Sequence, residues 1–466
     1  MKSMNIEEIR TVVRGWRLSE GKDLGACGVS IDSRTAEAGD VFVAVAGERF
    51  DGHDFLSEAA AAGCVAAVVE RDRPLSDEDL AAFPGGAIGV MDTIRALGDL
   101  AGRNRQIVGA DVVAITGSNG KTTVKEMVHH ILSSRLGGRC SPRSYNNHIG
   151  VPLTLLGAEP GDDYIVCEIG ANAPGEIANL GRIAQPDVAV VTSVAASHLE
   201  GFRNVERVAA EKASLLGALR AGGMAVVFRD NELLRKSVGA YTSRVVWFGE
   251  SEGSVLRLTG REANGRTQRI ELNGRLSFEL PLAGKHNAMN ALAAIAVAQR
   301  FGMQPEESGE AMRDFQGVAM RLQWIDAGDR MIINDAYNAN PASMAAAAGV
   351  LAGCKGRRIL IAGDMLELGP DAADLHHQTG RELGETGLEL IVGVGELGQL
   401  IAEGAAGAGA TAEAMVDMDE ALQRVPEMIG AGDVVLVKGS RGMRMERLVD
   451  HLVADGSDPA GKDGDT

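Results

Sequence analysis

The amino-acid sequence predicts an α/β protein of three domains, in which a small α/β domain precedes two doubly wound sheets. Its length of 466 residues suggests about three domains at ~150 residues each. Apolar runs without alternation, such as VVAI at 112–115 and VAVV at 188–191, are typical of parallel strands buried on both faces. Each run is followed by a polar or glycine-rich stretch, which is the rhythm of a parallel sheet flanked by helices.

The composition argues against several classes of protein. Lysine and arginine number 46 against 64 aspartates and glutamates, and this net charge of −18 argues against nucleic-acid binding. The five cysteines show no C-x-x-C spacing, which is typical of reduced thiols in a cytoplasmic enzyme. The N-terminus has no signal-peptide pattern, and no apolar run approaches the ~18 residues that span a bilayer. We therefore expect a cytoplasmic enzyme without stable membrane insertion.

The first region extends to the FPGG sequence at 83–86. Strand-like runs at 41–47 (VFVAVAG) and 65–70 (VAAVVE) enclose a helix-like, alanine-rich segment at 55–62. We interpret this region as the small α/β domain.

The second region, at about 93–302, predicts the central parallel sheet. After Lys121, apolar residues of the segment 124–132 recur at helical spacing, so the preceding loop joins a strand to a helix. Two Asn-Gly pairs, at 264–265 and 273–274, predict a small antiparallel flap of hairpins. A helix is expected at about 287–301.

The third region, at about 303–454, repeats the alternation of strands and helices. Its apolar runs MIIN, RILIAG, LELIVGVG and DVVLVKG predict a second, Rossmann-like doubly wound sheet. The last residues, 455–466, are acidic, rich in glycine and without large apolar groups, so we expect a disordered tail.

The stretch TGSNGKTT at 116–123 is the strongest candidate for a ligand-binding loop. The usual phosphate-loop pattern requires glycine at position 115, where this chain has isoleucine. Gly117 and Gly120 nevertheless permit backbone N–H groups to surround an anion at the start of a helix. Lys121 can reach the outer phosphates and the Thr122 hydroxyl can ligate Mg²⁺. The alternative is a tight turn with an exposed lysine; the strand–loop–helix setting favours the phosphate site.

Other polar side chains also follow apolar runs: Glu168, His198, Asp335 and Lys438. Ligands bind beyond the carboxyl ends of strands in open α/β sheets, so a shared ligand face explains them together. With the Thr122 hydroxyl, the first two offer oxygen and nitrogen ligands for Mg²⁺. The alternatives are an exposed glutamate at a strand end and a hydrogen-bonded core histidine.

Three further sites carry polar residues that are candidates for binding or for a structural role. Asn287 and Asn290 share one face of the predicted helix, and helix capping is the alternative to binding for Asn287. The glycine-bracketed loop with Lys438, Ser440 and Arg441 has the composition of an anion cradle. The local pattern around Lys212, taken alone, predicts a solvated surface lysine.

The order of motifs along the chain resembles that of the Mur ligase family. The motifs are TGSNGKTT, NNHIGVP, EIGANAPGEI, SHLEGF, GKHNAMNALAA, NDAYNANPASM, GDMLELG and VKGSRGMRME. The likeness spans nearly the whole chain, from SIDSR at 30–34 onward. The family's shortened loop, TG-x-x-GK-[ST]-T, also accounts for the isoleucine at position 115.

The resemblance implies a UDP-substrate-binding domain at 1–88, a central ATP-binding domain at 89–312 and a C-terminal Rossmann-like ligase domain at 313–454. It also implies an ATP-dependent, ADP-forming amide ligase of cell-wall peptidoglycan synthesis. The expected reaction adds D-alanyl-D-alanine to UDP-N-acetylmuramoyl-tripeptide through an acyl phosphate. We expect a monomer acting on these small molecules.

The resemblance assigns roles to individual residues. The loop residues Gly117, Ser118, Asn119, Gly120, Lys121, Thr122 and Thr123 would bind ATP, together with Asn287, Arg321 and Asp335. Two Mg²⁺ ions are expected on Thr122, Glu168 and His198, beside a carbamylated Lys212, and Lys121, Glu168, His198 and Lys212 form the catalytic set. The substrate would meet Ser33, Arg34, Arg49, His53, Asn146, Asn147, Asn338, Asn340, Ser343 and His376.

Two other functions are compatible with the same motifs. A sister ligase would add a different amino acid, such as the diamino acid of the third position. A non-catalytic nucleotide-binding protein would use the same scaffold for regulation. The sequence favours the dipeptide ligase because it retains Lys121, Thr122, Glu168, His198 and Lys212 and carries NDAYNANPASM.

Overall fold

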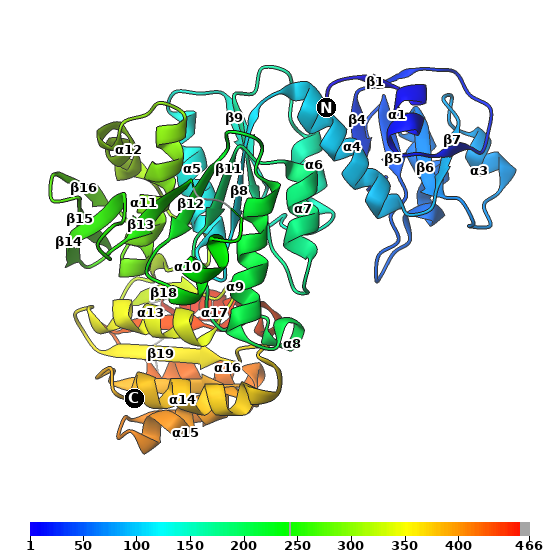
Figure 1. Ribbon diagram of the computed structural model, residues 1–466. Helices are drawn as coiled ribbons and strands as arrows, with labels where there is room; N and C mark the ends of the chain where they lie inside the picture. Colours follow the sequence, from blue (N-terminus) through cyan, green and yellow to red (C-terminus); the bar gives the residue numbers. More distant parts are fainter. Residues whose placement is uncertain (242–243, 457–466) are drawn as a thin grey trace.

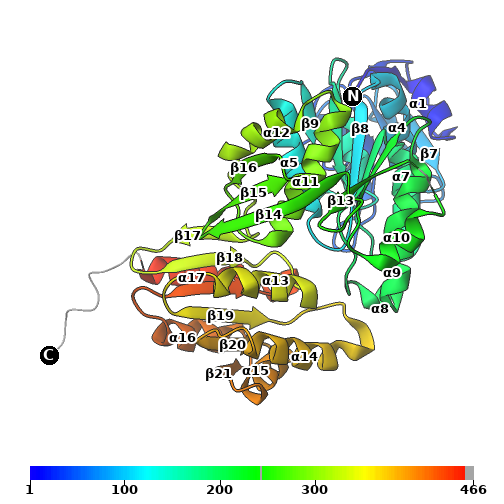
Figure 2. The same ribbon diagram turned by 60° about the vertical axis from the view of Figure 1, so that its left-hand side comes forward.

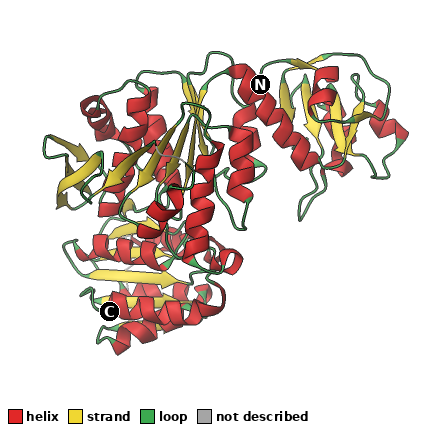
Figure 3. Cartoon of the chain, viewed as in Figure 1, coloured by secondary structure: helices red, strands yellow, loops and turns green. Residues whose placement is uncertain are grey.

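Three helix-flanked sheets follow one another along the chain in the computed structural model, which describes residues 1–241 and 244–456 (Figure 1). The N-terminal sheet lies to one side of the central sheet, and the C-terminal sheet lies below it (Figure 1). Helices pack against each of the three sheets (Figure 3). Among the described residues, no helix is long and apolar enough to cross a membrane.

The N-terminal region forms the predicted small α/β unit. Its five-stranded sheet has the order β2-β7-β6-β5-β4, with parallel pairs except at β2. Its elements are β1 (Met4–Asn5), α1 (Ile6–Val12), β2 (Trp16–Arg17), β3 (Gly25–Ala26), β4 (Gly28–Ser30), β5 (Asp40–Val43), η1 (Gly52–Phe55), α2 (Leu56–Ala61), β6 (Ala66–Glu70), α3 (Asp77–Ala81) and β7 (Ala87–Val90). The two predicted strands and the predicted helix are confirmed.

The central region is built around the predicted parallel sheet. Nine strands have the order β16-β15-β14-β13-β12-β11-β8-β10-β9, and β8 to β13 are all parallel. The first elements are α4 (Thr93–Val108), β8 (Asp111–Thr116), α5 (Lys121–Ser133), β9 (Gly138–Cys140), α6 (Gly150–Leu156), β10 (Tyr164–Glu168), α7 (Glu176–Ala184) and β11 (Val188–Val191). The following elements are α8 (Leu199–Phe202), α9 (Val205–Ser214), η2 (Leu215–Ala218), β12 (Met224–Phe228), α10 (Glu232–Val238), β13 (Val245–Gly249), β14 (Leu256–Asn264), β15 (Thr267–Leu272), β16 (Leu276–Leu280), α11 (Lys285–Arg300), α12 (Pro305–Ala311) and η3 (Met312–Asp314).

Both faces of this sheet are covered, which explains the apolar runs. Val113 and Ile115 of β8 belong to the hydrophobic cluster that contains α5 and α11. Val112 and Ala114 belong to the opposite cluster, with α4, α6, α7 and α9. Because successive strand residues point to opposite faces, a strand buried on both sides must be apolar at every position.

The predicted hairpins exist and extend the central sheet. Strands β14 to β16 are antiparallel, and the turns contain Gly265 (φ 60°), Asn273 (φ 56°) and Gly274 (φ 66°). β13 pairs with β14 in parallel, so the flap is joined edge to edge with the parallel strands.

The C-terminal region is the predicted second doubly wound sheet. Its order is β17-β18-β22-β19-β20-β21, with only the edge strand β17 antiparallel. The elements are β17 (Gln323–Asp326), β18 (Met331–Asp335), α13 (Pro341–Ala352), β19 (Arg358–Gly363), η4 (Gly369–Asp371), α14 (Ala372–Gly384), β20 (Leu390–Val394), α15 (Gly398–Gly407), β21 (Ala412–Met415), α16 (Met418–Met428), β22 (Val434–Lys438), η5 (Arg441–Met443) and α17 (Glu446–Gly456).

The expected limits of the regions differ from the observed elements by a few residues. A division after residue 88 cuts β7, whose Gly89 and Val90 pair with β2 and β6. A division after residue 312 cuts η3, and Phe315 still packs in the central core. The tail expected at 455–466 begins inside α17. Asp455 of this helix forms an ion pair with the buried Arg330 side chain. The rest of that tail lies outside the described residues.

A substitution pair in the C-terminal region tests its packing. A Cβ atom on Gly380 of α14 would lie 2.1 Å from the carbonyl oxygen of Ile401 on α15. Gly380→Ala should therefore lower the free energy of unfolding by about 1–3 kcal/mol, as overpacking does. Gly407→Ala on α15 meets nothing within 4 Å and should be neutral or stabilising. Guanidinium midpoints of both variants measure the difference, and equal midpoints would contradict this close helix contact.

Candidate active site

A cavity of about 1920 Å³ lies where the carboxyl ends of the central strands face the C-terminal region. It brings together predicted residues that are far apart in sequence. Its lining includes Ser118, Asn119, Gly120, Lys121, Thr122, Thr123, Asn146, Asn147, Glu168, His198, Lys212, Asn287, Arg321, Asp335, Asn338, Asn340 and Ser343. The structure therefore gathers around one cavity the residues that the sequence predicts to share a face.

The loop between β8 and α5 follows a path that requires glycine twice. Gly117 has φ 148°, and a Cβ atom there would lie 2.0 Å from the Thr192 hydroxyl oxygen. Gly120 has φ 84°, and a Cβ atom there would lie 2.4 Å from the Asn290 amide oxygen. Both glycines thus permit an approach of the loop to its neighbours that no other residue allows.

The segment after β11 supports this loop from the side. The Ser118 N–H donates to the Ser193 carbonyl at 2.9 Å, and the Asn119 N–H donates to the Ser193 hydroxyl at 2.9 Å. The Thr192 hydroxyl donates to the Asn119 carbonyl at 2.5 Å. The sequence analysis did not identify Thr192 and Ser193; their position directly after an apolar run was the available signal.

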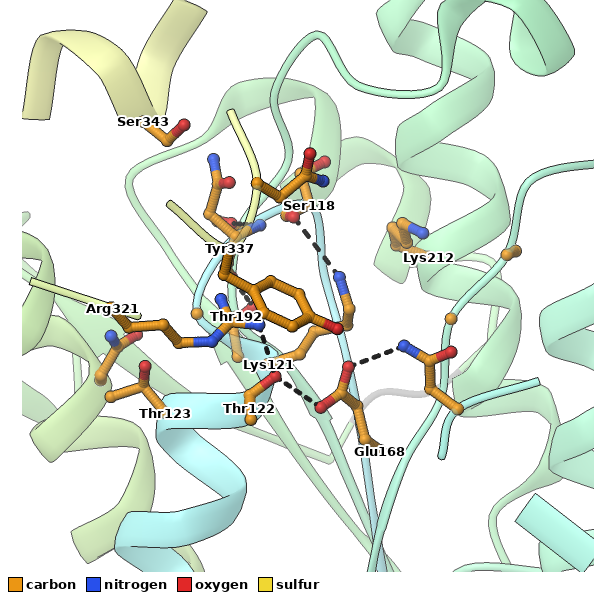
Figure 4. Close-up of a pocket in the computed structure, with 18 of the residues that line it drawn as sticks. Ser118, Lys121, Thr122, Thr123, Glu168, Thr192, Lys212, Arg321, Tyr337 and Ser343 are labelled. Carbon is orange, nitrogen blue, oxygen red and sulfur yellow. Dashed lines mark hydrogen bonds between the residues drawn. The ribbon is translucent and has the colours of Figure 1, made fainter. Parts of the chain in front are cut away.

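Lys121 and Glu168 form the polar centre of the site (Figure 4). The Lys121 ammonium donates to the Gly117 carbonyl at 2.8 Å, inside the curve of the loop. Burial lowers the pKa of Lys121, and the negative charge of Glu168 acts in the opposite direction. Glu168 ends β10 and is 1% exposed.

The Glu168 carboxylate has a hydrogen-bond donor at each oxygen, and one of these donors, the Thr122 hydroxyl, also contacts Arg321. Thr122 donates its hydroxyl to Glu168 Oε2 at 2.7 Å, and the Asn146 amide donates to Oε1 at 2.8 Å. The Arg321 guanidinium donates to the Thr122 hydroxyl at 2.8 Å (Figure 4). The described residues contain no cluster of three or more His, Cys, Asp or Glu side chains that could hold a metal. A hydroxyl and one carboxylate instead fit Mg²⁺, which commonly takes its other ligands from phosphates and water.

Lys212 is buried beside the same cavity. Its side chain is 1% exposed, on α9, with the ammonium 5.8 Å from the centre of the Phe202 ring. Burial, reinforced by the charge of Lys121, lowers the pKa of Lys212 to about 7, although Glu211 and Glu176 oppose the shift. The interpretation as a solvated surface lysine is therefore wrong.

The C-terminal region contacts the phosphate loop directly. The Asn340 amide donates to Asn119 Oδ1 at 2.8 Å, and the Asn119 amide donates back to Asn340 Oδ1 at 3.3 Å. Arg321 also stacks on the Tyr337 ring, 4.2 Å from its centre. The Asn119–Asn340 pair joins residues that are 221 positions apart in the sequence.

Other C-terminal polar residues are held near this interface. The Lys438 ammonium donates to Asp335 Oδ2 at 2.6 Å and to the Asn338 carbonyl at 2.9 Å. Ser343 completes the cap of α13, because its hydroxyl accepts from the Asn340 backbone N–H at 2.9 Å. The charge of Lys438 is thus neutralised by Asp335 in this arrangement.

Asn287 lies at the third position of α11, after Gly284, and does not cap the helix with its side chain. Its amide donates to the Ala283 carbonyl at 2.8 Å, and its oxygen accepts from Asn290 at 3.2 Å. The two asparagines therefore share one face, as their spacing predicts.

Family models match three consecutive parts of the chain. They are described as the Mur ligase family, catalytic domain (27–105), the Mur ligase middle domain (115–298) and the Mur ligase, glutamate ligase domain (320–441). The UDP-N-acetylmuramoyl-tripeptide–D-alanyl-D-alanine ligase of Bacillus subtilis is 35% identical, over 91% of this chain and 93% of its own. The chain belongs to the Mur ligase family.

Further Mur ligases match over almost the whole length. The enzyme of the same name from Escherichia coli is 36% identical, over 98% of this chain and all of its own. A crystal structure of MurF from Acinetobacter baumannii superposes with a TM-score of 0.88 at 32% identity, covering 97% of this chain and 99% of that one. MurF from Thermotoga maritima, solved in complex with ADP, has a TM-score of 0.82 at 28% identity, covering 93% and 98%.

His198 of this Mur ligase lies at the junction with the C-terminal region. Its Nδ1 atom is 2.5 Å from Glu367 Oε2, and this contact lowers the pKa of Glu367. The ring lines the cavity that contains Glu168, and its Nδ1 atom lies against Glu367. The sequence motif GDMLELG contained this glutamate, but nothing in its local pattern pointed to His198.

Two predicted substrate residues are core histidines with both ring nitrogens engaged. His53 is 6% exposed; its Nδ1 lies 2.6 Å from Asp51 and its Nε2 accepts from the Glu70 N–H at 2.9 Å. His376 is fully buried; its Nδ1 lies 2.6 Å from the Ala372 carbonyl and its Nε2 accepts from the Met365 N–H at 2.8 Å. Both rings thus have protein partners at each nitrogen in this structure, and their assignment to the substrate stays a prediction.

The other N-terminal candidates are away from the cavity. Ser33, Arg34 and Arg49 do not line it. Arg34 is exposed and forms an ion pair with Asp32 at 2.6 Å, and Arg49 is exposed. Their assignment to the UDP-substrate stays a prediction.

The lowered pKa of Lys212 can be measured by amine labelling. A reagent that attacks only neutral amines should modify Lys212 with a midpoint near pH 7, because burial disfavours its ammonium form. Mass spectrometry of the Lys212 peptide follows the reaction, with the exposed Lys236 as the internal reference. If both peptides show the same pH profile, the buried environment of Lys212 is contradicted.

Proposed function

We propose that this Mur ligase joins D-alanyl-D-alanine to UDP-N-acetylmuramoyl-tripeptide, with conversion of ATP to ADP and phosphate, in peptidoglycan precursor synthesis. The observation that carries the proposal is the single cavity shared by the phosphate loop, Glu168, Lys212 and the C-terminal loop at 335–343. The ligases of that name from Bacillus subtilis and Escherichia coli align over more than nine-tenths of both chains. The two nucleotide substrates are cytoplasmic metabolites, so the proposed location is the cytoplasm.

The chemistry requires activation of a carboxylate. An ionised carboxylate resists attack by an amine because it has no adequate leaving group. Transfer of the γ-phosphoryl group of ATP to the tripeptide carboxylate releases ADP and forms an acyl phosphate. The neutral amine of D-alanyl-D-alanine then attacks the carbonyl carbon, loses a proton, and phosphate leaves as the amide forms.

The residues of the loop bind and orient the phosphates in this proposal. The backbone N–H groups at the start of α5 face the anion, and Lys121 would exchange its contact with the Gly117 carbonyl for phosphate oxygens. Arg321, which contacts Thr122 in this structure, is assigned to the γ-phosphate. Asn287 is assigned to the adenine and Asp335 to the ribose.

Thr122 and Glu168 would hold a first Mg²⁺, and His198 with Glu168 a second. When bound, Mg²⁺ neutralises phosphate charge during phosphoryl transfer. His198 would have to exchange its contact with Glu367 for this role. The substrate is assigned to Asn146 and Asn147 in the central region, to Asn338, Asn340 and Ser343 in the C-terminal region, and to Ser33, Arg34 and Arg49 in the N-terminal region.

We also propose that Lys212 is carbamylated. Its neutral amine would attack the carbon of CO₂ and lose one proton, so that an anionic carbamate replaces an ammonium. Only the neutral amine reacts, and a pKa of about 7 leaves a substantial neutral fraction at neutral pH. A carbamate at Lys212 would be favoured by the positive charge of Lys121, which disfavours the ammonium form of Lys212.

Phosphate release from ATP tests the function. Turnover should require both UDP-N-acetylmuramoyl-tripeptide and D-alanyl-D-alanine. Lys121→Ala should reduce turnover by at least about 10³-fold, since preorganised charge at transferring phosphates is worth several kcal/mol. Lys236→Ala, at an exposed ion pair, is the matched control and should keep the wild-type rate. Turnover with free amino acids in place of the dipeptide would identify a sister ligase, and no turnover would contradict the proposal.

Carbamylation is tested with ¹³C-bicarbonate and NMR. The wild-type chain should show a carbamate resonance that grows as the pH rises through about 7 at constant dissolved CO₂, because the neutral amine is the reactant. The resonance should be missing in Lys212→Ala. Equal spectra of the two proteins would contradict the modification.

A further inference from the structure

Lys125 is a buried lysine that the mechanism does not use. It lies on α5, one helical turn after Lys121, and its side chain is 0% exposed. A buried ammonium is costly unless it is paired and hydrogen-bonded. Its environment therefore has to supply compensating partners, and these partners show what the residue holds in place.

The Lys125 ammonium binds the start of the loop that follows β9. It donates to the Ser141 carbonyl at 2.6 Å and to the Arg143 carbonyl at 2.8 Å. Glu126 Oε1 lies 2.7 Å from the same nitrogen and balances its charge. Arg143 has φ 47°, so the chain turns sharply at the point where Lys125 holds it.

The same loop holds Glu168 at two points. The Ser141 hydroxyl accepts from the Glu168 N–H at 3.2 Å. The Asn146 amide donates to Glu168 Oε1 at 2.8 Å, and the Asn146 carbonyl accepts from the Gly170 N–H at 2.8 Å. A displacement of the loop therefore changes both the backbone and the carboxylate of Glu168.

Helix α5 thus fixes both oxygens of the Glu168 carboxylate, one directly and the other through the loop after β9. Thr122, one residue after the loop lysine, contacts Glu168 Oε2 directly. Lys125, three residues later on the same helix, contacts the loop that binds Oε1. The helix that presents the phosphate site also sets the orientation of the carboxylate beside it.

We propose that Lys125 is a positioning residue that orients Glu168 for Mg²⁺ through the loop at 141–146. The proposal rests on the proposed function only for the identity of the cation and nucleotide. Groups that orient metal ligands typically change metal affinity or activity by about 10–100-fold when removed. A purely structural lysine would change the stability of the chain and leave its response to Mg²⁺ unaltered.

Lys125→Met in the full-length chain tests the proposal, because methionine fills the apolar space without donating. ADP binding is measured by isothermal titration at a series of Mg²⁺ concentrations. The Mg²⁺ midpoint, which is the concentration that gives half of the full Mg²⁺ effect on ADP affinity, should rise by about 10-fold or more. This measurement contains neither peptide substrate, so it is independent of ligase turnover. If the wild-type chain shows no ligase turnover but Lys125→Met still raises the Mg²⁺ midpoint, the proposed function fails and the inference stands.

Two controls separate the contacts of Lys125. Lys236→Met makes the same change at an exposed ion pair and should leave the Mg²⁺ midpoint at the wild-type value. Glu126→Gln removes the balancing charge and keeps both carbonyl contacts, so its midpoint should stay within about two-fold of wild type. A Glu126→Gln variant that reproduces the full shift would overturn the role of the loop contacts.

A double-mutant cycle tests the route through the loop. Asn146→Ala and Lys125→Met should be less than additive in their effect on the Mg²⁺ midpoint, because both act on Glu168 through one segment. Circular dichroism verifies that the variants are folded. Should Lys125→Met not fold, Lys125→Leu, which also lacks a donor, is judged by the same midpoint. An unchanged midpoint in a folded variant, or full additivity, would overturn the inference.

Discussion

The burial of the Glu168 carboxylate is the constraint on which the site depends. An unpaired ion inside a protein costs several kcal/mol, and this carboxylate is 1% exposed at the end of a central strand. Each oxygen accordingly has a donor, Thr122 from the phosphate helix on one side and Asn146 on the other. The positions of α5 and of the loop after β9 are therefore coupled to one acidic side chain, and a divalent cation would complete its neutralisation.

The second requirement is that the C-terminal region reaches the phosphate loop. Arg321 and Asn340 make this contact, one to the Thr122 hydroxyl and the other to the Asn119 amide. Seen from the side, the C-terminal sheet lies directly beneath the central one (Figure 2). An acyl phosphate hydrolyses if water reaches it, so an arrangement that closes the cavity over the loop suits the proposed chemistry.

The sequence predicted much of this site because its parts are local. The phosphate loop is eight consecutive residues between a buried strand and an amphipathic helix. Glu168 and Asp335 end apolar strands, and His198 lies between β11 and α8. The error concerns burial. Lys212 has the local pattern of a surface lysine and is 1% exposed. A helical pattern does not tell how closely another segment covers it.

The sequence by itself determined the order of strands and helices, the three regions and the chemistry of the phosphate loop, since these follow from periodicity and from neighbours along the chain. Only the tertiary structure decided which side chains meet. The pairs Asn119–Asn340, Thr122–Arg321 and His198–Glu367 join residues about 170 to 220 positions apart. Such contacts depend on how the sheets pack against each other, and no local pattern contains that information. The lowered pKa of Lys212 is of the same kind, because desolvation arises from atoms that the rest of the fold places around it.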